Sequence, residues 1–157
     1  MKLLIFSDSH NETEAMLDAV RRENPELIVH LGDHIHDTPA IRARFPDIPL
    51  RTVRGNCDFG ADGGDMELLK ICGRMILLTH GHLYGVKNGL DKITRKGASA
   101  GADLVLFGHT HRAYIGQSGR LRLFNPGAVC GRGWDRDRTY GVAYLGEEEI
   151  RCEIKEA

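Results

Sequence analysis

Near its start the chain carries Lys2-Leu3-Leu4-Ile5-Phe6-Ser7-Asp8-Ser9-His10, a stretch whose pattern recurs at later strand ends. An apolar run of strand length ends in a carboxylate and an imidazole two residues apart. Side chains at i and i+2 of an extended segment point to the same side, so Asp8 and His10 are expected to converge on one ion. A carboxylate oxygen and a neutral imidazole nitrogen are ordinary ligands of a divalent transition metal. The remaining ligands have to come from elsewhere in the chain.

The composition indicates an ordinary globular protein, which we expect to form one domain over residues 1–157. Hydrophobic residues make up 41% and charged residues 27% of the chain, and the formal net charge is −1. This charge balance predicts neither a membrane surface nor stable nucleic-acid binding. The apolar run at 3–6 is too short for a signal peptide, and no segment has the length of a membrane span. We therefore expect a cytoplasmic protein.

The four cysteines lack the spacing of a metal-binding or redox pair. They stand at Cys57, Cys72, Cys130 and Cys152, with no C-x-x-C motif among them. A chain of this length with no secretory signal does not depend on disulfides for a stable core. We expect reduced thiols at all four positions.

The first third of the chain predicts alternating strands and helices. A helical stripe runs from Asn11 to Glu23, with Asn11 as the expected N-cap and Glu14 completing a capping box. The expected elements that follow are a strand over 27–31, a short helix over 39–44 and a strand over 50–54. This β-α-β-α-β order predicts parallel strands, whose carboxyl ends share one edge of the sheet.

The rest of the chain predicts a second group of strands. After a loop over 59–65 we expect a hairpin of strands 67–71 and 75–79, with its turn near Cys72-Gly73-Arg74. A helix over 86–98 and a strand over 104–107 follow. The runs 121–124, 139–145 and 149–154 have the alternation of antiparallel strands, and a loop rich in Gly and Arg covers 125–138.

Five apolar strands end in side chains that can bind a metal. These side chains are Asp8 with His10, Asp33, Asn56, His80, and His109 with His111. A glycine stands next to four of these positions, where it lets the backbone approach an ion closely. Each motif by itself is more simply explained as a turn or a hydrogen-bonded polar residue. Their coincidence at five strand ends favours a metal site.

These motifs also carry a family resemblance. The ordered set Asp8-x-His10, Gly32-Asp33, Gly55-Asn56, His80-Gly-His82 and Gly108-His109-x-His111 resembles the calcineurin-like metallophosphoesterase superfamily. The small size, the Gly-Asn-Cys-Asp sequence and the later Asn125-Pro126-Gly127 are most similar to its compact bacterial and archaeal phosphodiesterases. The resemblance implies an α/β fold, a four-layer α-β-β-α sandwich with two mixed β-sheets.

The resemblance further implies a centre of two divalent metal ions. Asp33 would bridge them, with Asp8, His10 and His111 completing one site and Asn56, His80 and His109 the other. Two carboxylates against two divalent ions leave a charge of about +2, which attracts a phosphodiester monoanion, and a metal-bridging hydroxide would attack it. Oxygen and nitrogen ligands without a thiolate favour Mn²⁺, with Fe, Zn or Ni as alternatives.

One position departs from the family pattern. Many larger relatives have a histidine after Gly-Asn that helps to protonate the leaving oxygen, and this chain has Cys57 there. Because a thiol is a poor acid in this role, His82 and His34 become the candidate proton donors. The alternative for both, and more so for His36, is a hydrogen-bonding or surface histidine. His30, in the middle of an apolar run, is expected to be a core residue.

The loop over 127–138 offers a possible recognition element. It contains Arg132, Trp134, Arg136 and Arg138, and arginine and tryptophan can bind phosphate oxygens and stack on a nucleobase. The alternative is a solvated loop in which the arginines pair with Asp135 and Asp137.

The leading hypothesis is a phosphodiesterase that acts on a small phosphodiester or nucleotide-like substrate. A phosphomonoesterase on the same centre is the first alternative. The second is a non-catalytic scaffold, because the superfamily includes a metal-poor retromer subunit; loss of ligands would identify such a member, and here all seven expected positions are filled. The sequence leaves the oligomeric state open, a homodimer or larger assembly included.

Overall fold

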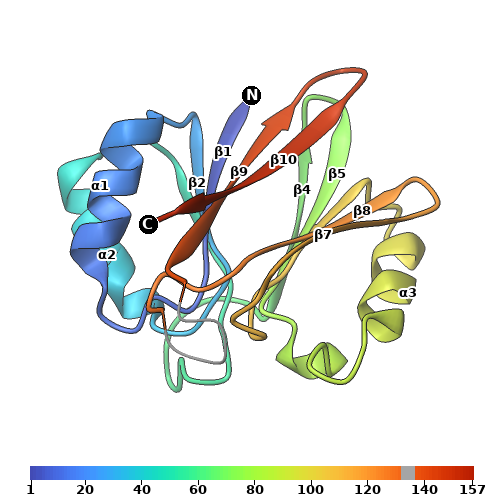
Figure 1. Ribbon diagram of the computed structural model, residues 1–157, viewed down its shortest axis with the longest axis horizontal. Helices are drawn as coiled ribbons and strands as arrows, with labels where there is room; N and C mark the ends of the chain where they lie inside the picture. Colours follow the sequence, from blue (N-terminus) through green and yellow to red (C-terminus); the bar gives the residue numbers. More distant parts are fainter. Residues whose placement is uncertain (132–136) are drawn as a thin grey trace.

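The fold is two five-stranded mixed sheets packed face to face, with helices on both outer faces (Figure 1). It is taken from a computed structural model, which describes residues 1–131 and 137–157. In Figure 1 helices α1 and α2 cover one sheet and α3 covers the other, which gives the four layers α-β-β-α. The four-layer sandwich with two mixed sheets is therefore confirmed.

The first sheet has the strand order β10-β9-β1-β2-β3. Strands β1, β2 and β3 are parallel, whereas β9 pairs antiparallel with both β1 and β10. Helices α1 and α2 connect the parallel strands, as the β-α-β-α-β pattern predicted. The bounds are β1 Lys2–Phe6, α1 Thr13–Glu23, β2 Leu27–His30, the 3₁₀-helix η1 Ile35–Asp37, α2 Thr38–Arg44, β3 Leu50–Thr52, β9 Thr139–Leu145 and β10 Ile150–Glu156.

The second sheet has the strand order β4-β5-β6-β8-β7. Strands β5, β6 and β8 are parallel, and the two edge strands β4 and β7 pair antiparallel with their neighbours. The bounds are β4 Met66–Ile71, β5 Arg74–Thr79, the 3₁₀-helix η2 His82–Tyr84, α3 Asp91–Ser99, β6 Leu104–Leu106, β7 Ala113–Ser118 and β8 Leu121–Pro126.

The core explains why the central strands are continuously apolar. Leu3 and Ile5 of β1 belong to the cluster between the two sheets, whereas Leu4 and Phe6 belong to the cluster under α1 and α2. A strand covered on both faces buries every side chain, so the polar alternation of a half-exposed strand is missing. On the second sheet Ile93 of α3 packs with alternate residues of β5 and β6 in the same way.

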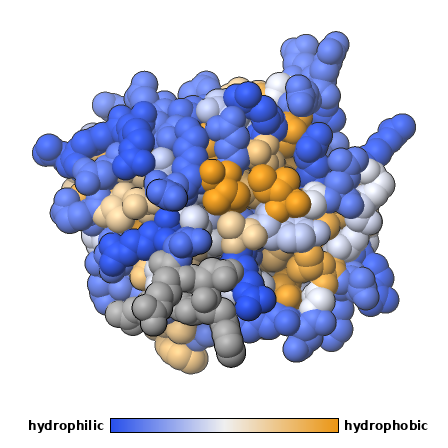
Figure 2. All heavy atoms as spheres, viewed as in Figure 1, coloured by the Kyte–Doolittle hydropathy of each residue, from blue (hydrophilic) through white to orange (hydrophobic). Residues whose placement is uncertain are grey.

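The surface is mostly polar over the helices. Figure 2 shows apolar side chains gathered near the middle of this face of the molecule, between mostly polar flanks. Four partly buried apolar residues of β4 and β10 pack against the central cluster: Leu69, Ile71, Cys152 and Ile154. Within the described residues no helix is long and apolar enough to span a membrane.

Several element boundaries differ from the predictions. Helix α1 begins at Thr13 and its N-cap is Glu12 without a side-chain cap, so the capping box at Asn11 and Glu14 is wrong. Asn11 instead has a φ of 72°, and its backbone N–H donates to Asp37 Oδ2 over 2.9 Å. The tertiary hydrogen bond displaces the local capping pattern.

The third helix begins later in the structure than the prediction of a helix over 86–98. Helix α3 spans Asp91–Ser99, because Gly89 has a φ of 144° and interrupts the helical backbone before it. Strand β7 was not among the predicted strands, since its side chains are mostly exposed and its sequence does not alternate. The hairpin of β4 and β5 is confirmed, with Cys72 and Gly73 both at positive φ in its tight turn.

Candidate metal centre

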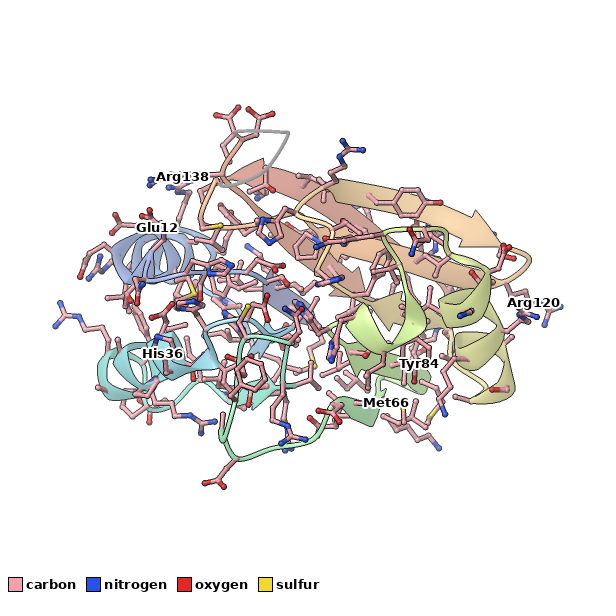
Figure 3. All side chains as sticks on the ribbon, turned by 90° about the horizontal axis from the view of Figure 1, so that it is seen from below. Glu12, His36, Met66, Tyr84, Arg120 and Arg138 are labelled. Atoms are coloured by element: carbon pink, nitrogen blue, oxygen red, sulfur yellow. The ribbon has the colours of Figure 1, made fainter. Side chains whose placement is uncertain are left out.

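The predicted ligands lie together at one end of the sandwich. The loops after β1, β2, β3, β5 and β6 gather at the lower end of the molecule in Figure 1, the end that faces the reader in Figure 3. Parallel strands place their carboxyl ends at a common edge, and here the two packed sheets present those edges side by side. Residues 101 positions apart in sequence meet there in the hydrogen bond from His109 N to Asp8 Oδ2 of 3.1 Å.

The backbone conformation that brings Asp8 and His10 together differs from the predicted one. Strand β1 ends at Phe6, so Asp8 and His10 do not lie in an extended segment, and the prediction from i, i+2 alternation is wrong in its geometry. Both residues have positive φ, of 53° and 43°, and five of the seven predicted ligands share this left-handed conformation: Asp8, His10, Asp33, His109 and His111. Non-glycine residues held in this region cluster at functional sites, where the surrounding structure imposes the conformation.

The first group of donors consists of Asp8, His10 and His111. One ligand atom from each lies within 4.8 Å of the others. Asp8 Oδ2 accepts hydrogen bonds from Ser7 Oγ, at 2.5 Å, and from His109 N. Asp8 Oδ1 is buried and accepts no hydrogen bond from the described residues, although His111 Nε2 lies 3.0 Å from it. One carboxylate oxygen is thus held in place while the other is directed at the imidazoles.

The second group consists of Asp33, His80 and His109, with Asn56 beside them. His80 Nε2 lies 3.2 Å from Asn56 Oδ1, 3.2 Å from His109 Nδ1 and 3.5 Å from Asp33 Oδ1. His80 Nδ1 lies 2.8 Å from the carbonyl oxygen of Leu31, and since a carbonyl can only accept, Nδ1 carries the proton. In the neutral imidazole Nε2 therefore presents its lone pair to the other donors.

Both groups fit a divalent cation. Ligand atoms about 2.1 Å from a shared ion lie roughly 3.0–3.4 Å apart in octahedral or tetrahedral geometry, and the distances around His80 Nε2 fall close to this range. Carboxylate, amide and imidazole lone pairs that face one another repel unless a cation or a proton lies between them. An orphaned carboxylate oxygen on Asp8 and a directed lone pair on His80 are the atoms that such a cation would satisfy.

The electrostatics of the centre keep its carboxylates ionised. Burial alone would raise the pKa of Asp33, but hydrogen bonds from His80 and Cys57 and the charge of His80 hold it well below its ordinary value. The pKa of Asp8 is likewise lowered, because the interactions with His111 and His80 outweigh burial. Burial and nearby positive charge on His80 and Lys87 lower the pKa of His109 to about 4, so its imidazole is neutral at pH 7.

Two further imidazoles of the centre shift in opposite directions. Burial would lower the pKa of His80, but its hydrogen bond to Asp33 and the charges of Asp8 and Asp33 raise it. Burial and neighbouring His34 lower the pKa of His10. A proton on His80 compensates the carboxylates when no cation does so, and a cation would replace that proton.

Asp58 positions two of the ligand loops and was missed by the sequence analysis. Its buried carboxylate accepts hydrogen bonds from Asp33 N at 2.8 Å, Ile35 N at 2.9 Å and Gly55 N at 2.7 Å. The loops after β2 and β3 are therefore fixed to each other. Gly55 is required at this junction, since a Cβ there would collide with Asp33 Oδ1 and its amide nitrogen. Its position two places after Asn56 was the signal in the sequence that could have identified Asp58 as part of the site.

Asn125 has the same positioning role for the loop after β6. Its Nδ2 donates to the carbonyl of Gly108 at 2.9 Å and to Thr110 Oγ1 at 3.1 Å, while its Oδ1 accepts from Gly127 N at 2.9 Å. A buried side chain thus fixes the loop that carries His109. The sequence analysis used Asn125 only as part of the family resemblance.

His30 is a core residue, as predicted. It is fully buried, its Nδ1 accepts from Gly32 N, and its Nε2 donates to Ser9 Oγ at 3.0 Å. Ser9 Oγ in turn donates to Asp37 Oδ2 at 2.7 Å. Burial lowers the pKa of His30 to about 4, so the ring stays neutral and serves the packing of the loops behind the centre.

The two candidate proton donors lie on opposite sides of the centre. The His82 ring centroid is 5.4 Å from that of His80 and 6.1 Å from that of His109, next to the second group. The His34 ring is 4.3 Å from that of His10, next to the first group. His36 is exposed beside Asp37. His82 and His34 therefore each lie beside a proposed metal ligand, and neither is one of the seven proposed ligands.

The predicted recognition loop falls mostly outside the described residues. Arg132, Trp134, Asp135 and Arg136 belong to the segment 132–136, which the structure does not describe. Arg138 is described, and it forms a two-pronged ion pair with Glu12, at 3.0 Å and 2.9 Å (Figure 3). Glu12, at the start of α1, is thus a partner of this arginine.

Comparison with known proteins identifies relatives across nearly the whole chain. Residues 1–148 match the family described as the calcineurin-like phosphoesterase superfamily domain. The probable metallophosphoesterase YsnB of Bacillus subtilis is 39% identical over 151 residues, which cover 92% of this chain and 85% of the relative. The phosphodiesterase YfcE of Escherichia coli K12 is 27% identical over 166 residues, covering 90% of this chain and 86% of the relative.

Solved structures share the fold. A predicted phosphoesterase from Streptococcus pneumoniae superposes with a TM-score of 0.84 at 23% identity, covering 99% of this chain and 88% of that one. Vps29 from Entamoeba histolytica, solved in complex with Zn²⁺, has a TM-score of 0.79 at 17% identity and covers 99% of both chains. At these identities the likeness concerns the arrangement of strands and helices alone.

Proposed function

Since this chain belongs to the calcineurin-like phosphoesterase superfamily, we propose that it is a phosphodiesterase that depends on two divalent metal ions. One observation carries the proposal: oxygen and nitrogen donors from four separate loops converge in two adjoining groups, Asp8/His10/His111 and Asp33/His80/His109. Asn56 joins the second group through the short distance to His80.

We assign Asp33 as the ligand shared by the two ions. Its Oδ1 is 3.5 Å from His80 Nε2 in the second group, and its charge also acts on His10 in the first. Asp8, His10 and His111 would hold one ion, and Asn56, His80 and His109 the other. When bound, a pair of such ions lowers the pKa of a shared water and neutralises charge on the phosphoryl oxygens.

Residues outside the ligand set hold the proposed ligands in place. Asp58 and Asn125 fix the three loops that carry Asp33, Asn56 and His109, so the donors need little rearrangement to bind the ions. His82 and His34 are the two candidate proton donors for the leaving oxygen, one on each side of the centre. The Mn²⁺ ion suits the donor set, with Fe, Zn or Ni as alternatives.

A diester substrate is favoured over a monoester. YfcE, one of the relatives above, is a phosphodiesterase by name. A diester carries one negative charge, and the two carboxylates Asp8 and Asp33 leave a modest positive charge on a centre of two divalent ions. The test is a hydrolysis panel on Mn²⁺-loaded protein with a bis-aryl diester, an aryl monoester, cyclic nucleotides and dinucleotides. A monoester rate far above the diester rate would make the phosphomonoesterase alternative correct.

Asp33→Asn is the decisive variant. It removes the proposed shared ligand but keeps the size of the side chain, so we expect the bound-metal content to fall and diester hydrolysis to drop at least about 100-fold. Metal content is measured by atomic emission after gel filtration, and folding by circular dichroism. Asp47→Asn, an exposed aspartate outside the centre, is the matched control and should behave as wild type. Full activity of a metal-free Asp33→Asn protein would contradict the proposal.

The scaffold alternative makes the opposite prediction for the same panel. The Vps29 likeness concerns the fold, and a non-catalytic scaffold would be expected to lack ligands that this chain retains. A protein shown to carry two ions that hydrolyses no ester of the panel would favour the scaffold.

A further inference from the structure

A third group of metal-binding side chains lies outside the seven proposed ligands. His34, His36 and Asp37, on the turn into η1, place one ligand atom each within 4.8 Å of one another. The group is adjacent to the proposed centre in sequence, since His34 follows Asp33. It shares no residue with either of the two groups described above.

Asp37 is held so that one oxygen remains available. Its Oδ2 accepts hydrogen bonds from Ser9 Oγ at 2.7 Å and from Asn11 N at 2.9 Å. Its Oδ1 lies 3.7 Å from His36 Nε2, a spacing that two ligands of one ion can have. The carboxylate is buried and held by contacts with the loop after β1, so it does not need to be ordered when an ion binds.

His34 has an unused nitrogen in the same place. Its Nδ1 is buried and has no hydrogen-bond partner among residues 1–131 and 137–157. His34 also has a φ of 68°, a conformation that only outside contacts maintain in a residue with a Cβ. A buried ring nitrogen without a partner is costly unless a ligand satisfies it.

Three histidine rings, tilted against one another by 56° and 46°, follow each other from the proposed centre to the surface and are called the histidine stack. The His34 ring lies between His10, at 4.3 Å between centroids, and His36, at 4.6 Å. His10 and His34 are partly buried, whereas the side chain of His36 is 64% exposed. Figure 3 shows His36 beside α2 at the edge of the site-bearing end. An ion held by His34 and His36 would therefore be next to His10, a ligand of the first group.

We propose that His34, His36 and Asp37 form a third divalent-cation site, from which an ion passes along the histidine stack to Asp8, His10 and His111. Two imidazole nitrogens and one carboxylate oxygen select Zn²⁺, Mn²⁺, Fe²⁺ or Ni²⁺ over Ca²⁺ and Mg²⁺. Three protein ligands with one exposed member leave room for water, which suits a site that must release its ion. The transfer step rests on the function proposed above, whereas the third site itself does not.

His36→Ala tests the site without touching the proposed ligands or proton donors. Zn²⁺ and Mn²⁺ are titrated into metal-free protein by calorimetry, and we expect a third, weaker ion in wild type that the variant binds about tenfold or more weakly. Asp47→Ala, which removes an exposed carboxylate near α2 in sequence, is the control and should keep the third ion. Two ions in wild type, or three ions held equally by His36→Ala, would overturn the site.

Metal loading tests the transfer. Co²⁺ absorbance in stopped flow follows ligand binding, and we expect the first group to load about tenfold more slowly in His36→Ala, with unchanged hydrolysis once loading is complete. Equal loading rates would refute the transfer. The Asp33→Asn protein separates the two proposals: it should still bind the His36-dependent ion, and loss of that ion in an otherwise folded Asp33→Asn protein would count against an independent third site.

Discussion

At the scale of single residues, Cys57 raises the question of which residue protonates the leaving oxygen. Its backbone N–H donates to Asp33 Oδ1 at 2.8 Å, so the residue lies at the edge of the proposed site. Burial and the neighbouring Asp33 raise the pKa of the Cys57 thiol to about 11. The thiol therefore stays protonated at neutral pH, which makes Cys57 a weak proton donor.

We predict that His82 supplies the proton that Cys57 cannot. His82→Ala should slow hydrolysis of an alkyl diester by about 100-fold or more but change the bis-aryl rate less than about tenfold, since an aryl leaving group needs little protonation. His34→Ala, on the other side of the centre, should not show this dependence on the leaving group. Steady-state rates across diesters with leaving groups of graded pKa provide the measurement.

Cys57→His serves as the rescue. The family resemblance places a histidine at this position in many larger relatives, so the change introduces an imidazole beside Asp33. In the His82→Ala background it should recover most of the lost alkyl-diester rate. Equal losses for aryl and alkyl esters in His82→Ala would instead indicate a damaged metal site and contradict the assignment.

Metal ligands are easier to recognise in the sequence than the residues that position them. All seven expected ligands lie where donors converge, yet Asp58 and Asn125, which hold their loops, were not identified. Ligands are recognisable because they follow apolar strands at characteristic spacings. A positioning residue is defined by its contacts with residues that are distant in the sequence, and the sequence does not reveal these contacts.

At the scale of elements, α3 shows how closely helix and sheet pack. Gly97 faces β6 and β8, and a Cβ there would lie 2.5 Å from Val105 Cγ2 and 2.9 Å from Leu121 Cδ2. A glycine in the interior of a helix costs about 1 kcal/mol relative to alanine, so its presence reflects this close approach. The packing of the element overrides its local propensity.

Gly97→Ala should therefore destabilise the protein despite the better helix former. We expect the free energy of unfolding to fall by about 1–3 kcal/mol through overpacking, measured by urea denaturation. Ser99→Ala, exposed on the same helix, should change it by less than about 0.5 kcal/mol. A stabilised Gly97→Ala protein would show that α3 can move away from the sheet.

At the scale of the whole molecule, the central cluster draws apolar side chains from both sheets, which supports our proposal that residues 1–157 form one domain. Glu23, at the end of α1, links distant parts of this fold. Its carboxylate accepts a hydrogen bond from Tyr140 Oη at 2.9 Å and ion-pairs with Lys155 at 2.9 Å and Lys2 at 2.7 Å. Strands β1, β9 and β10 are thereby joined to α1.

This network predicts a pH dependence of stability. Burial would raise the pKa of Glu23, but hydrogen bonds from Lys2, Lys155 and Tyr140 lower it to about 2. A carboxylate with a depressed pKa in the folded state stabilises it above its unfolded pKa, which is 4.5, and this contribution is lost as the pH falls toward 2. Glu23→Gln should lose roughly 3 kcal/mol at pH 7.

Urea denaturation at pH 7, 5 and 3 checks the prediction. The difference between wild type and Glu23→Gln should be nearly constant from pH 7 to pH 5 and shrink by pH 3. Glu148→Gln, an exposed glutamate, provides the control for a change of surface charge. A difference that is the same at all three pH values would mean that the ion pairs contribute nothing to the effect.

The sequence by itself determined most of the strands, the parallel order of β1, β2 and β3, and the family to which the chain belongs. Continuous apolar runs identify doubly covered strands, and polar residues at their ends identify the edge where ligands meet. These are local patterns, so one dimension is enough to recognise them. The boundaries of α1 and α3 and the existence of β7 were less accessible, because tertiary hydrogen bonds and glycine conformations decide them.

Only the tertiary structure decided how the donors converge. Asp8, His10, Asp33, His109 and His111 reach their positions through left-handed backbone conformations, not through the alternation of an extended strand. L-residues adopt such conformations at a cost. The hydrogen bonds that hold them join loops far apart in sequence: Asp33 N donates to Asp58, and His109 N donates to Asp8. The third group at His34, His36 and Asp37 became visible for the same reason, since its aim depends on Ser9 and His10.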